Sequence, residues 1–164
     1  MLIDFDGSPN KVDLNEIHDA LEFYAEILLG KRLSKNIKLN VTFVPNLMKR
    51  RQTEADCNFE DEDAKIHREF TINIDSGFSR PKTLQCLAHE MVHVKQMAKG
   101  ELTIAYVKGR GHLNRWKNTL VDENKIGYWD VPWEIEAYGR ELGLYVRYDQ
   151  DKKEKVTKAK KLGG

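Results

Sequence analysis

The segment His89-Glu90-Met91-Val92-His93 places two imidazoles and one carboxylate within five consecutive residues. Residues four apart lie on the same face of an α-helix, so His89 and His93 could bind one metal ion through their ring nitrogens. Glu90 directly follows the first histidine, where a carboxylate can reach a water held by that metal. The H-E-x-x-H spacing therefore predicts a metal-dependent hydrolytic site, provided that the segment is a helix.

The residues on either side of the motif predict such a helix. Pro81 suits a first helical turn, Ser79 suits the N-cap before it, and Gly100 suits a C-terminal stop. Between them one apolar stripe recurs with the helical period, formed by Leu84, Leu87, Ala88, Met91, Val94 and Ala98. At about 100° per residue, the two histidines fall roughly opposite this stripe. We therefore expect one face of the helix to join the core and the His pair to face a cleft.

A catalytic zinc ion usually has three protein ligands and one open position, so the His pair needs a third partner. The downstream candidates are His112, Glu134 and Glu136. Pro132 suits the first turn of a second helix that would carry both glutamates. These glutamates lie about 200° apart around that helix, so they cannot both face one metal ion. The surroundings of His112, rich in Arg, Gly and Asn, favour an exposed loop histidine over a metal ligand.

Two motifs resemble those of the zincin metallopeptidases. Leu87-Ala-His-Glu-Met-Val-His93 resembles the zincin active-site helix, and Glu134-Ile-Glu-Ala137 matches the E-x-x-A pattern of several zincin families. Over roughly residues 37 to 146, the chain is similar to small SprT-like or minigluzincin-type domains, including ones encoded by phages. The resemblance implies Zn²⁺ as the cofactor, His89, His93 and Glu134 as its ligands, and Glu90 as the catalytic general base.

His112 is the rival third ligand within the same resemblance. SprT-like proteases use a third histidine in a segment resembling G-H-G-x-x-W/F. Gly111-His112, followed by Trp116, is similar to that segment, although Leu113 replaces its second glycine.

The implied function is a zinc-dependent peptidase acting on a protein or peptide substrate. The metal would polarise the scissile carbonyl, while Glu90 would take a proton from water and pass it to the leaving amine. Candidates for stabilising the oxyanion are Tyr106, Tyr128, Tyr138, Arg110 and Arg140. Trp129 and Trp133 could line the cleft or pack beside the second helix.

Two other functions are compatible with the same residues. A zinc-stabilised binding module without turnover would close the site with four protein ligands, using both Glu134 and His112. A DNA-associated SprT-like protease is the second alternative, for which the lysine-rich residues 151–164 and the segment 108–117 would supply positive charge.

Composition favours one soluble domain. The 164 residues are 40 % hydrophobic and 32 % charged with a net charge of +1, so no overall field favours nucleic acid or membrane binding. Two distant cysteines do not make a disulfide framework, which favours a reducing compartment. No apolar run has the length of a membrane span, and the acidic N-terminus does not resemble a signal peptide. We therefore expect a cytoplasmic protein.

The remaining pattern predicts the elements that must position the motifs. We expect a helix over 14–29 that ends at Gly30. Strands are expected over 37–44 and 66–74, with shorter strands near 102–107 and 119–121. The charged residues of the segment 46–63 should lie in a solvated loop. The second helix should run from Pro132 to about residue 147, and 151–164 should be a frayed helix end or a disordered tail. This order predicts an α+β fold, a single zincin-like domain over 1–150 with a short mixed or antiparallel sheet over the motif helix. The strand 66–74 should form the sheet edge that pairs with an extended substrate.

Overall fold

The computed structural model describes residues 1–162, and their order of elements is α+β, as the sequence predicts. The elements follow the chain as β1 (Leu2–Asp6), α1 (Leu14–Ser34), β2 (Lys38–Val44), α2 (Leu47–Arg51), β3 (Ala55–Phe59), β4 (Glu69–Asp75), α3 (Arg80–Ala98), β5 (Leu102–Val107), β6 (Gly111–Trp116), β7 (Thr119–Val121), two short 3-10 turns η1 (Glu123–Lys125) and η2 (Tyr128–Asp130), and α4 (Pro132–Leu162).

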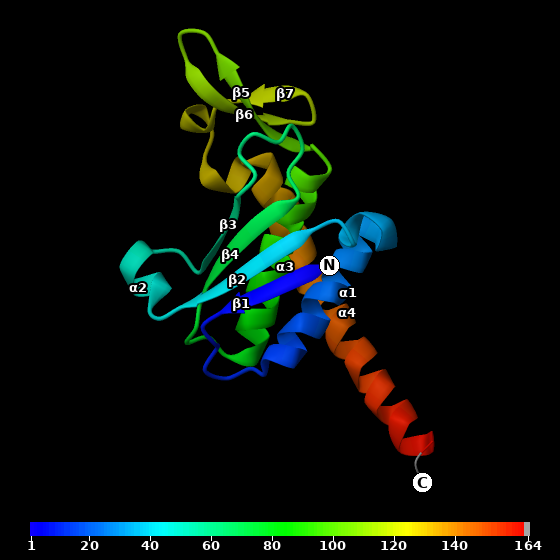
Figure 1. The fold of residues 1–164 in the computed structure, drawn as a ribbon. Coiled ribbons are helices and arrows are strands. Elements are labelled where there is room, and N and C mark those ends of the chain that lie inside the picture. Colours follow the sequence, from blue (N-terminus) through cyan, green and yellow to red (C-terminus); the bar gives the residue numbers. More distant parts are fainter. Residues whose placement is uncertain (163–164) are drawn as a thin grey trace.

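The main sheet is mixed, with strand order β1-β2-β4-β3. β1, β2 and β4 are parallel, and β3 is antiparallel to β4. In Figure 1 the sheet lies in front of α1, α3 and α4. Alternate residues of β2 and β4 are buried against this helical layer, because successive strand residues point to opposite faces: Leu39, Val41, Phe43, Phe70, Ile72 and Ile74. The apolar stripe of α3 completes the same core, and Tyr24 of α1 donates a hydrogen bond to the carbonyl of Leu84 at 3.2 Å.

The first helix continues beyond the glycine that was predicted to end it. Asp13 caps its start by accepting a hydrogen bond from the N–H of Asn15 at 2.7 Å. Gly30 adopts φ 79° and ψ 160°, a conformation that interrupts the helix. A further turn follows to Ser34, so Gly30 produces a kink and not an end.

The prediction that residues 66–74 form the sheet edge is wrong. That strand, β4, begins at Glu69 and is paired on one side with β2 and on the other with β3. The two edge strands are β1 and β3, and β3 lies in the segment predicted as loop. Its approach to β4 is fixed by Asp61, which accepts a hydrogen bond from the N–H of Arg68 at 2.7 Å and contacts His67 at 3.0 Å. Such side-chain contacts leave no periodic signal in the sequence.

A second, three-stranded antiparallel sheet of order β5-β6-β7 stands beyond the main sheet, at the top of Figure 1. β5 and β7 agree with the predicted strands at 102–107 and 119–121. β6 was not predicted, since its mixed sequence Gly-His-Leu-Asn-Arg-Trp lacks a clear alternation. The tight turn into β7 uses Lys117 and Asn118, both with positive φ, the backbone that joins twisted hairpin strands.

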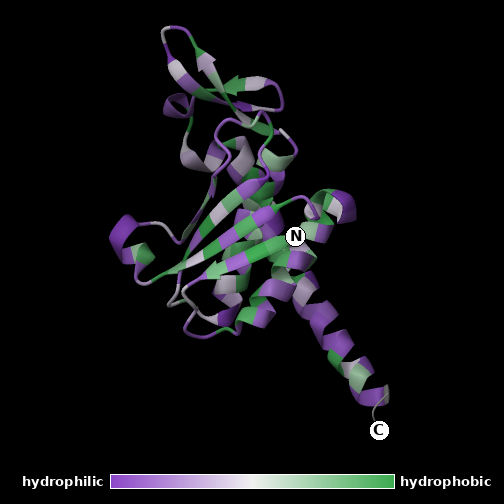
Figure 2. Cartoon of the chain, in the orientation of Figure 1, coloured by the Kyte–Doolittle hydropathy of each residue, from purple (hydrophilic) through white to green (hydrophobic). Residues whose placement is uncertain are grey.

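The last helix is longer than predicted. α4 runs without a break from Pro132 to Leu162, through the region expected to be a frayed end or a disordered tail. Ion pairs four residues apart line its distal part, joining Asp149 to Lys153 and Asp151 to Lys155. This end projects from the rest of the molecule and is mostly hydrophilic (Figures 1 and 2). Residues 163–164 of the predicted tail lie outside the described part of the chain. No helix within residues 1–162 combines the length and the apolar character that crossing a membrane requires.

Candidate metal centre

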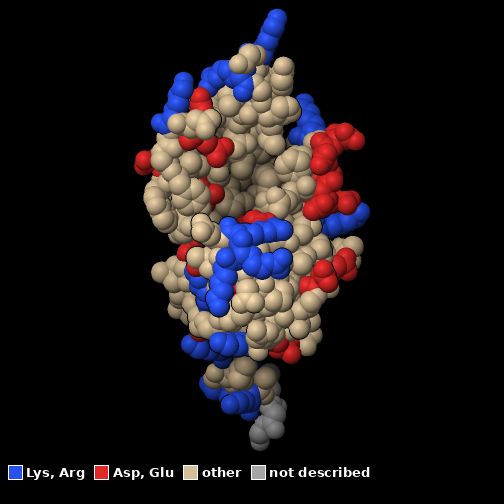
Figure 3. All heavy atoms as spheres, turned by 90° about the vertical axis from the view of Figure 1, so that its left-hand side faces the viewer, with Lys and Arg blue, Asp and Glu red and all other residues tan. Residues whose placement is uncertain are grey.

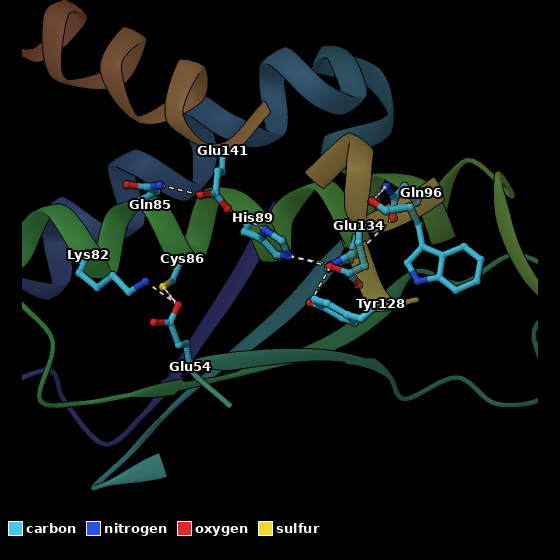
Figure 4. A network of polar contacts seen from close by, with 11 residues as sticks. Glu54, Lys82, Gln85, Cys86, His89, Gln96, Tyr128, Glu134 and Glu141 are labelled. Atoms are coloured by element: carbon cyan, nitrogen blue, oxygen red, sulfur yellow. Dashed lines mark hydrogen bonds and ion pairs between the residues drawn. The ribbon is translucent and has the colours of Figure 1, made fainter. Parts of the chain in front are cut away.

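The structure brings the three residues His89, His93 and Glu134 together between α3 and the first turn of α4 (Figure 4). The Nε2 atoms of His89 and His93 lie 3.1 Å apart. The carboxylate oxygens of Glu134 lie 3.3 Å from Nε2 of His89 and 3.5 Å from Nε2 of His93. Two helices far apart in sequence thus direct three donor atoms at one point.

These separations fit a metal ion. Zinc bonds of about 2.0–2.1 Å in a tetrahedron place neighbouring ligand atoms about 3.3 Å apart. The two Nε2 atoms lie 3.1 Å apart, and the two oxygens of Glu134 lie 3.3 Å from one of them and 3.5 Å from the other, which is close to that value. Imidazole nitrogens combined with a carboxylate oxygen are a donor set that divalent transition metals accept. The cluster could therefore hold a metal ion.

Each histidine is oriented by a hydrogen bond at its other ring nitrogen. Nδ1 of His89 lies 2.7 Å from Oε2 of Glu141, and Nδ1 of His93 lies 2.9 Å from Oε1 of Gln96. The fully buried amide of Gln96 is itself fixed, because its Nε2 donates to the carbonyl of Trp133 at 2.9 Å. A proton held at Nδ1 leaves the lone pair of Nε2 directed at the metal position, which is the usual arrangement around metal-binding histidines.

The electrostatics of the centre favour positive charge at the same point. Burial alone would lower the pKa of His89, but its hydrogen bonds to Glu134 and Glu141 outweigh burial and raise that pKa to about 9. Burial likewise opposes ionisation of Glu134, yet the contacts with His89 and His93 hold its pKa well below the usual range. Without a metal these groups attract protons, and a divalent cation would meet the same negative surroundings.

Glu90 is buried beside the centre and lacks a protein partner. It is 5 % exposed, and burial raises its pKa to about 7. Among residues 1–162, no side chain or backbone group forms a hydrogen bond with its carboxylate. Glu90 lines the cavities at the centre, so its carboxylate is accessible to a bound molecule.

Two cavities meet at the centre. The larger, of about 540 Å³, and the smaller, of about 260 Å³, are both lined by Ala55, His89, Glu90 and Tyr128. Figure 3 shows the surface hollowed between the upper and lower halves of the molecule. Together the cavities form one cleft, which we define by these two linings. Because β3 contributes Ala55 to both, the edge strand runs along the cleft.

The two rival third ligands lie elsewhere. Oε1 of Glu136 contacts Nζ of Lys95 at 2.7 Å and its Oε2 accepts a hydrogen bond from Nε2 of Gln96 at 3.1 Å, so this carboxylate is not part of the His cluster. His112 is exposed on β6, where its ring packs against Tyr106 with centroids 5.6 Å apart. Glu134 contacts both histidines, whereas Glu136 contacts Lys95 and Gln96.

Aromatic residues surround one side of the centre. The Tyr128 hydroxyl donates to Oε2 of Glu134 at 3.0 Å, and the Tyr138 ring lies 4.6 Å from that of His89, between centroids. Trp129 is 71 % exposed and lines the larger cavity, which agrees with the prediction that this residue could line the cleft. Trp133 is buried and also contributes to the lining of the smaller cavity.

Sequence reasoning missed the orienting residues Glu141 and Gln96. Glu141 lies seven residues after Glu134, and Gln96 lies three residues after His93. Both spacings place a side chain on the same helical face as the ligand, so helical periodicity could have proposed them.

No family model matches the chain, and neither does any curated protein or solved structure to which it was compared. The functional proposal that follows therefore stands on the residues of the centre and their geometry.

Proposed function

We propose that this protein is a zinc-dependent peptidase. In this proposal His89, His93 and Glu134 hold Zn²⁺, and Glu90 is the general base. The observation that supports it most strongly is that one ligand atom from each of these three residues lies within 4.8 Å of the other two, beside the Glu90 carboxylate in the same cleft.

The chain's own groups supply the proton transfers. Bound zinc contributes Lewis acidity, which lowers the pKa of water and polarises a carbonyl oxygen. Glu90 lies in the shared lining of both cavities, so its carboxylate can accept a proton from water there and return it to the leaving amine. Burial raises the pKa of this carboxyl group, which favours its taking up a proton from water.

Tyr128 is the best placed of the five candidates for stabilising the oxyanion. Its hydroxyl contacts Glu134, and the residue lines both cavities. Tyr138 lines the larger cavity only, Tyr106 and Arg110 belong to the β5–β6 hairpin, and Arg140 is engaged by Glu136 at 3.0 Å. A hydroxyl donor at the centre can stabilise negative charge that develops on a substrate carbonyl.

The edge strand supports an extended peptide as substrate. β3 is paired only with β4, so one edge of the strand is free beside the cleft. Its residue Ala55 lines both cavities, whereas Asp56 and Cys57 line the smaller one. An extended peptide can add to such an edge through main-chain hydrogen bonds, which holds a scissile bond along the cleft.

The test compares the wild-type protein with Glu90→Gln, each loaded with zinc. We expect equal zinc content and a loss of peptide hydrolysis of at least about 100-fold, because the amide cannot accept the proton. Glu154→Gln is the matched control, since Glu154 is exposed near the end of α4. Hydrolysis is followed with a mixture of fluorescence-quenched peptides. A Glu90→Gln protein that cleaves at the wild-type rate refutes the role of Glu90.

The non-catalytic zinc module remains the alternative and makes a different prediction. A structural zinc site is usually closed by four protein ligands. Within residues 1–162, the candidate cluster has three members, and His112 packs against Tyr106 instead. The proposal therefore expects His112→Ala to retain zinc and hydrolysis. Loss of zinc from this variant would support a closed, structural site.

A further inference from the structure

Three consecutive cations stand at the entrance of the larger cavity. Lys49, Arg50 and Arg51 of α2 are exposed, and we refer to them as the basic triplet. Met48 and Gln52, which immediately precede and follow the triplet, line that cavity. α2 lies at the left of Figure 1, and in Figure 3, which shows that side, basic side chains gather below the central hollow.

The triplet sits on a fixed turn of the chain. Leu47 anchors α2 in the core with no exposed surface, and the N–H of Met48 donates to Oδ2 of Asp75 at 3.0 Å. Asn46 and Gln52, at the two ends of α2, both have φ 56°, a left-handed conformation that is uncommon for residues other than glycine. Constrained backbone of this kind is often found at ligand-binding sites.

The charge of the triplet is not neutralised within the protein. Among residues 1–162, no carboxylate lies within ion-pair distance of its three side chains. Lys82, the cation that lines the larger cavity, is different, because its Nζ contacts Glu54 at 2.5 Å. The triplet therefore offers three positive charges next to a cavity whose own lining carries the carboxylates Glu54, Glu90 and Glu141.

The residues that follow the C-terminal end of β3 are acidic, whereas the basic triplet precedes its N-terminal end. β3 begins four residues after Arg51 and ends at Phe59, which is followed by the exposed acids Glu60, Glu62 and Asp63. A peptide paired along β3 would therefore meet cations at one end and carboxylates at the other. This gradient can select both the sequence and the direction of a bound chain.

We propose that the basic triplet selects peptide substrates that carry acidic side chains in the portion lying over the larger cavity. The inference rests on the proposed peptidase function and adds a substrate class to it. A peptide fits better than a nucleic acid, because a uniform polyanion along β3 would reach Glu60, Glu62 and Asp63 and be repelled.

The test removes the triplet and keeps everything else. The variant Lys49→Gln, Arg50→Gln, Arg51→Gln is compared with a control that removes three exposed cations at the far end of α4, namely Lys158→Gln, Lys160→Gln and Lys161→Gln. Circular dichroism and zinc content establish that both variants are folded and loaded. Each protein then cleaves a mixture of peptides obtained from a digested proteome, and mass spectrometry identifies the cleaved sequences.

We expect the wild type and the control to enrich Asp and Glu on one side of the cleaved bond, and the triplet variant to lose this enrichment. For a matched pair of peptides that differ only by Glu against Gln, loss of the triplet should lower kcat/KM for the Glu peptide about 5- to 10-fold, through lost ion pairs of modest strength. The value for the Gln peptide should stay unchanged, and added salt should reduce the preference. Equal kcat/KM for both peptides with the wild type overturns the inference while leaving the peptidase intact.

A binding measurement separates this inference from the proposed function. Zinc-loaded Glu90→Gln protein is titrated with the same peptides carrying a fluorescent label. Tighter binding of the Glu peptide, lost with the triplet, supports charge selection even if the wild type cleaves neither peptide. A single-stranded oligonucleotide is the competitor. If the oligonucleotide binds through the triplet and the Glu peptide is not preferred, the triplet is a nucleic-acid contact and the inference fails.

Discussion

Nδ1 of His89 lies 2.7 Å from Oε2 of Glu141, on the same helix that supplies Glu134 to the candidate metal centre. Because residues seven apart project from one face of a helix, α4 contributes both a candidate ligand and the carboxylate that orients a candidate ligand on α3. The centre therefore depends on the packing of α3 against α4 as much as on the H-E-x-x-H motif itself.

This relationship predicts that Glu141→Gln weakens metal binding without removing a ligand. The neutral amide is a weaker acceptor for the Nδ1 proton, so His89 becomes a poorer donor and zinc affinity should fall about 10- to 100-fold. Competition with a fluorescent chelator measures the affinity. Gln85→Ala is the control, since Gln85 donates to the other oxygen of Glu141 at 2.6 Å and does not contact the histidines. Equal affinities for Glu141→Gln and wild type would contradict this orienting role.

Substitutions of Glu134 and Glu136 should have different effects on zinc binding. Glu134→Gln should lose zinc, because it removes the charged donor of the cluster. Glu136→Gln should keep zinc and lower thermal stability, because Lys95 is buried and loses one of its two carboxylate partners. The expected cost is about 1–3 kcal/mol, typical of a charged hydrogen bond removed from a buried group. Metal analysis and thermal unfolding of both variants give the answer, and retention of zinc by Glu134→Gln would point to another third ligand.

Removing a single hydroxyl tests the role of Tyr128. Tyr128→Phe should retain zinc and lower kcat by about 10- to 1000-fold, because the oxyanion would lose a donor. Tyr106→Phe is the matched control, since Tyr106 is 71 % exposed on β5 and packs against His112. Steady-state kinetics with one peptide suffice. A change in KM alone for Tyr128→Phe would assign this hydroxyl to substrate binding and not to transition-state stabilisation.

Acid pH should destabilise the protein through Glu16, far from the metal centre. Burial opposes ionisation of Glu16, but hydrogen bonds from Arg80 and Lys152 outweigh it and lower its pKa. A lowered pKa in the folded state contributes stability above the ordinary glutamate pKa of about 4.3, and this contribution is lost as pH falls through the folded value. Glu16→Gln should therefore cost about 1–2 kcal/mol at neutral pH and almost nothing at strongly acid pH. Urea unfolding at both pH values measures this, and a constant difference would contradict it.

Helical periodicity allowed much of the centre to be predicted from sequence. The spacing of His89 and His93, the opposed stripe of α3 and the angle between Glu134 and Glu136 are local properties of a helix. Each of these local predictions agrees with the contacts in the structure. The choice of Glu134 over Glu136 came from an E-x-x-A resemblance, because helical geometry excludes only the pair together.

The position of β3 at the sheet edge could not be predicted from local periodicity. β3 is short and of mixed polarity, and its place at the sheet edge is set by β4 and by the contacts of Asp61. The alternating apolar residues of β4 identify only which face of this strand is buried. They therefore led to the wrong prediction that β4 forms an edge of the sheet. A strand's hydrophobic pattern carries no information about which neighbours pair with its two edges.

The sequence by itself determined that His89, Glu90 and His93 project to one side of a helix, because this follows from their helical spacing wherever that helix lies. Only the tertiary structure decided which distant groups complete the centre and line the cleft. The packing of α3 against α4 brings Glu134, Glu141 and Tyr128 to the histidines, and the order of the sheet places β3 and the basic triplet along the same cleft. These choices depend on contacts between residues far apart in the chain, which no local spacing encodes.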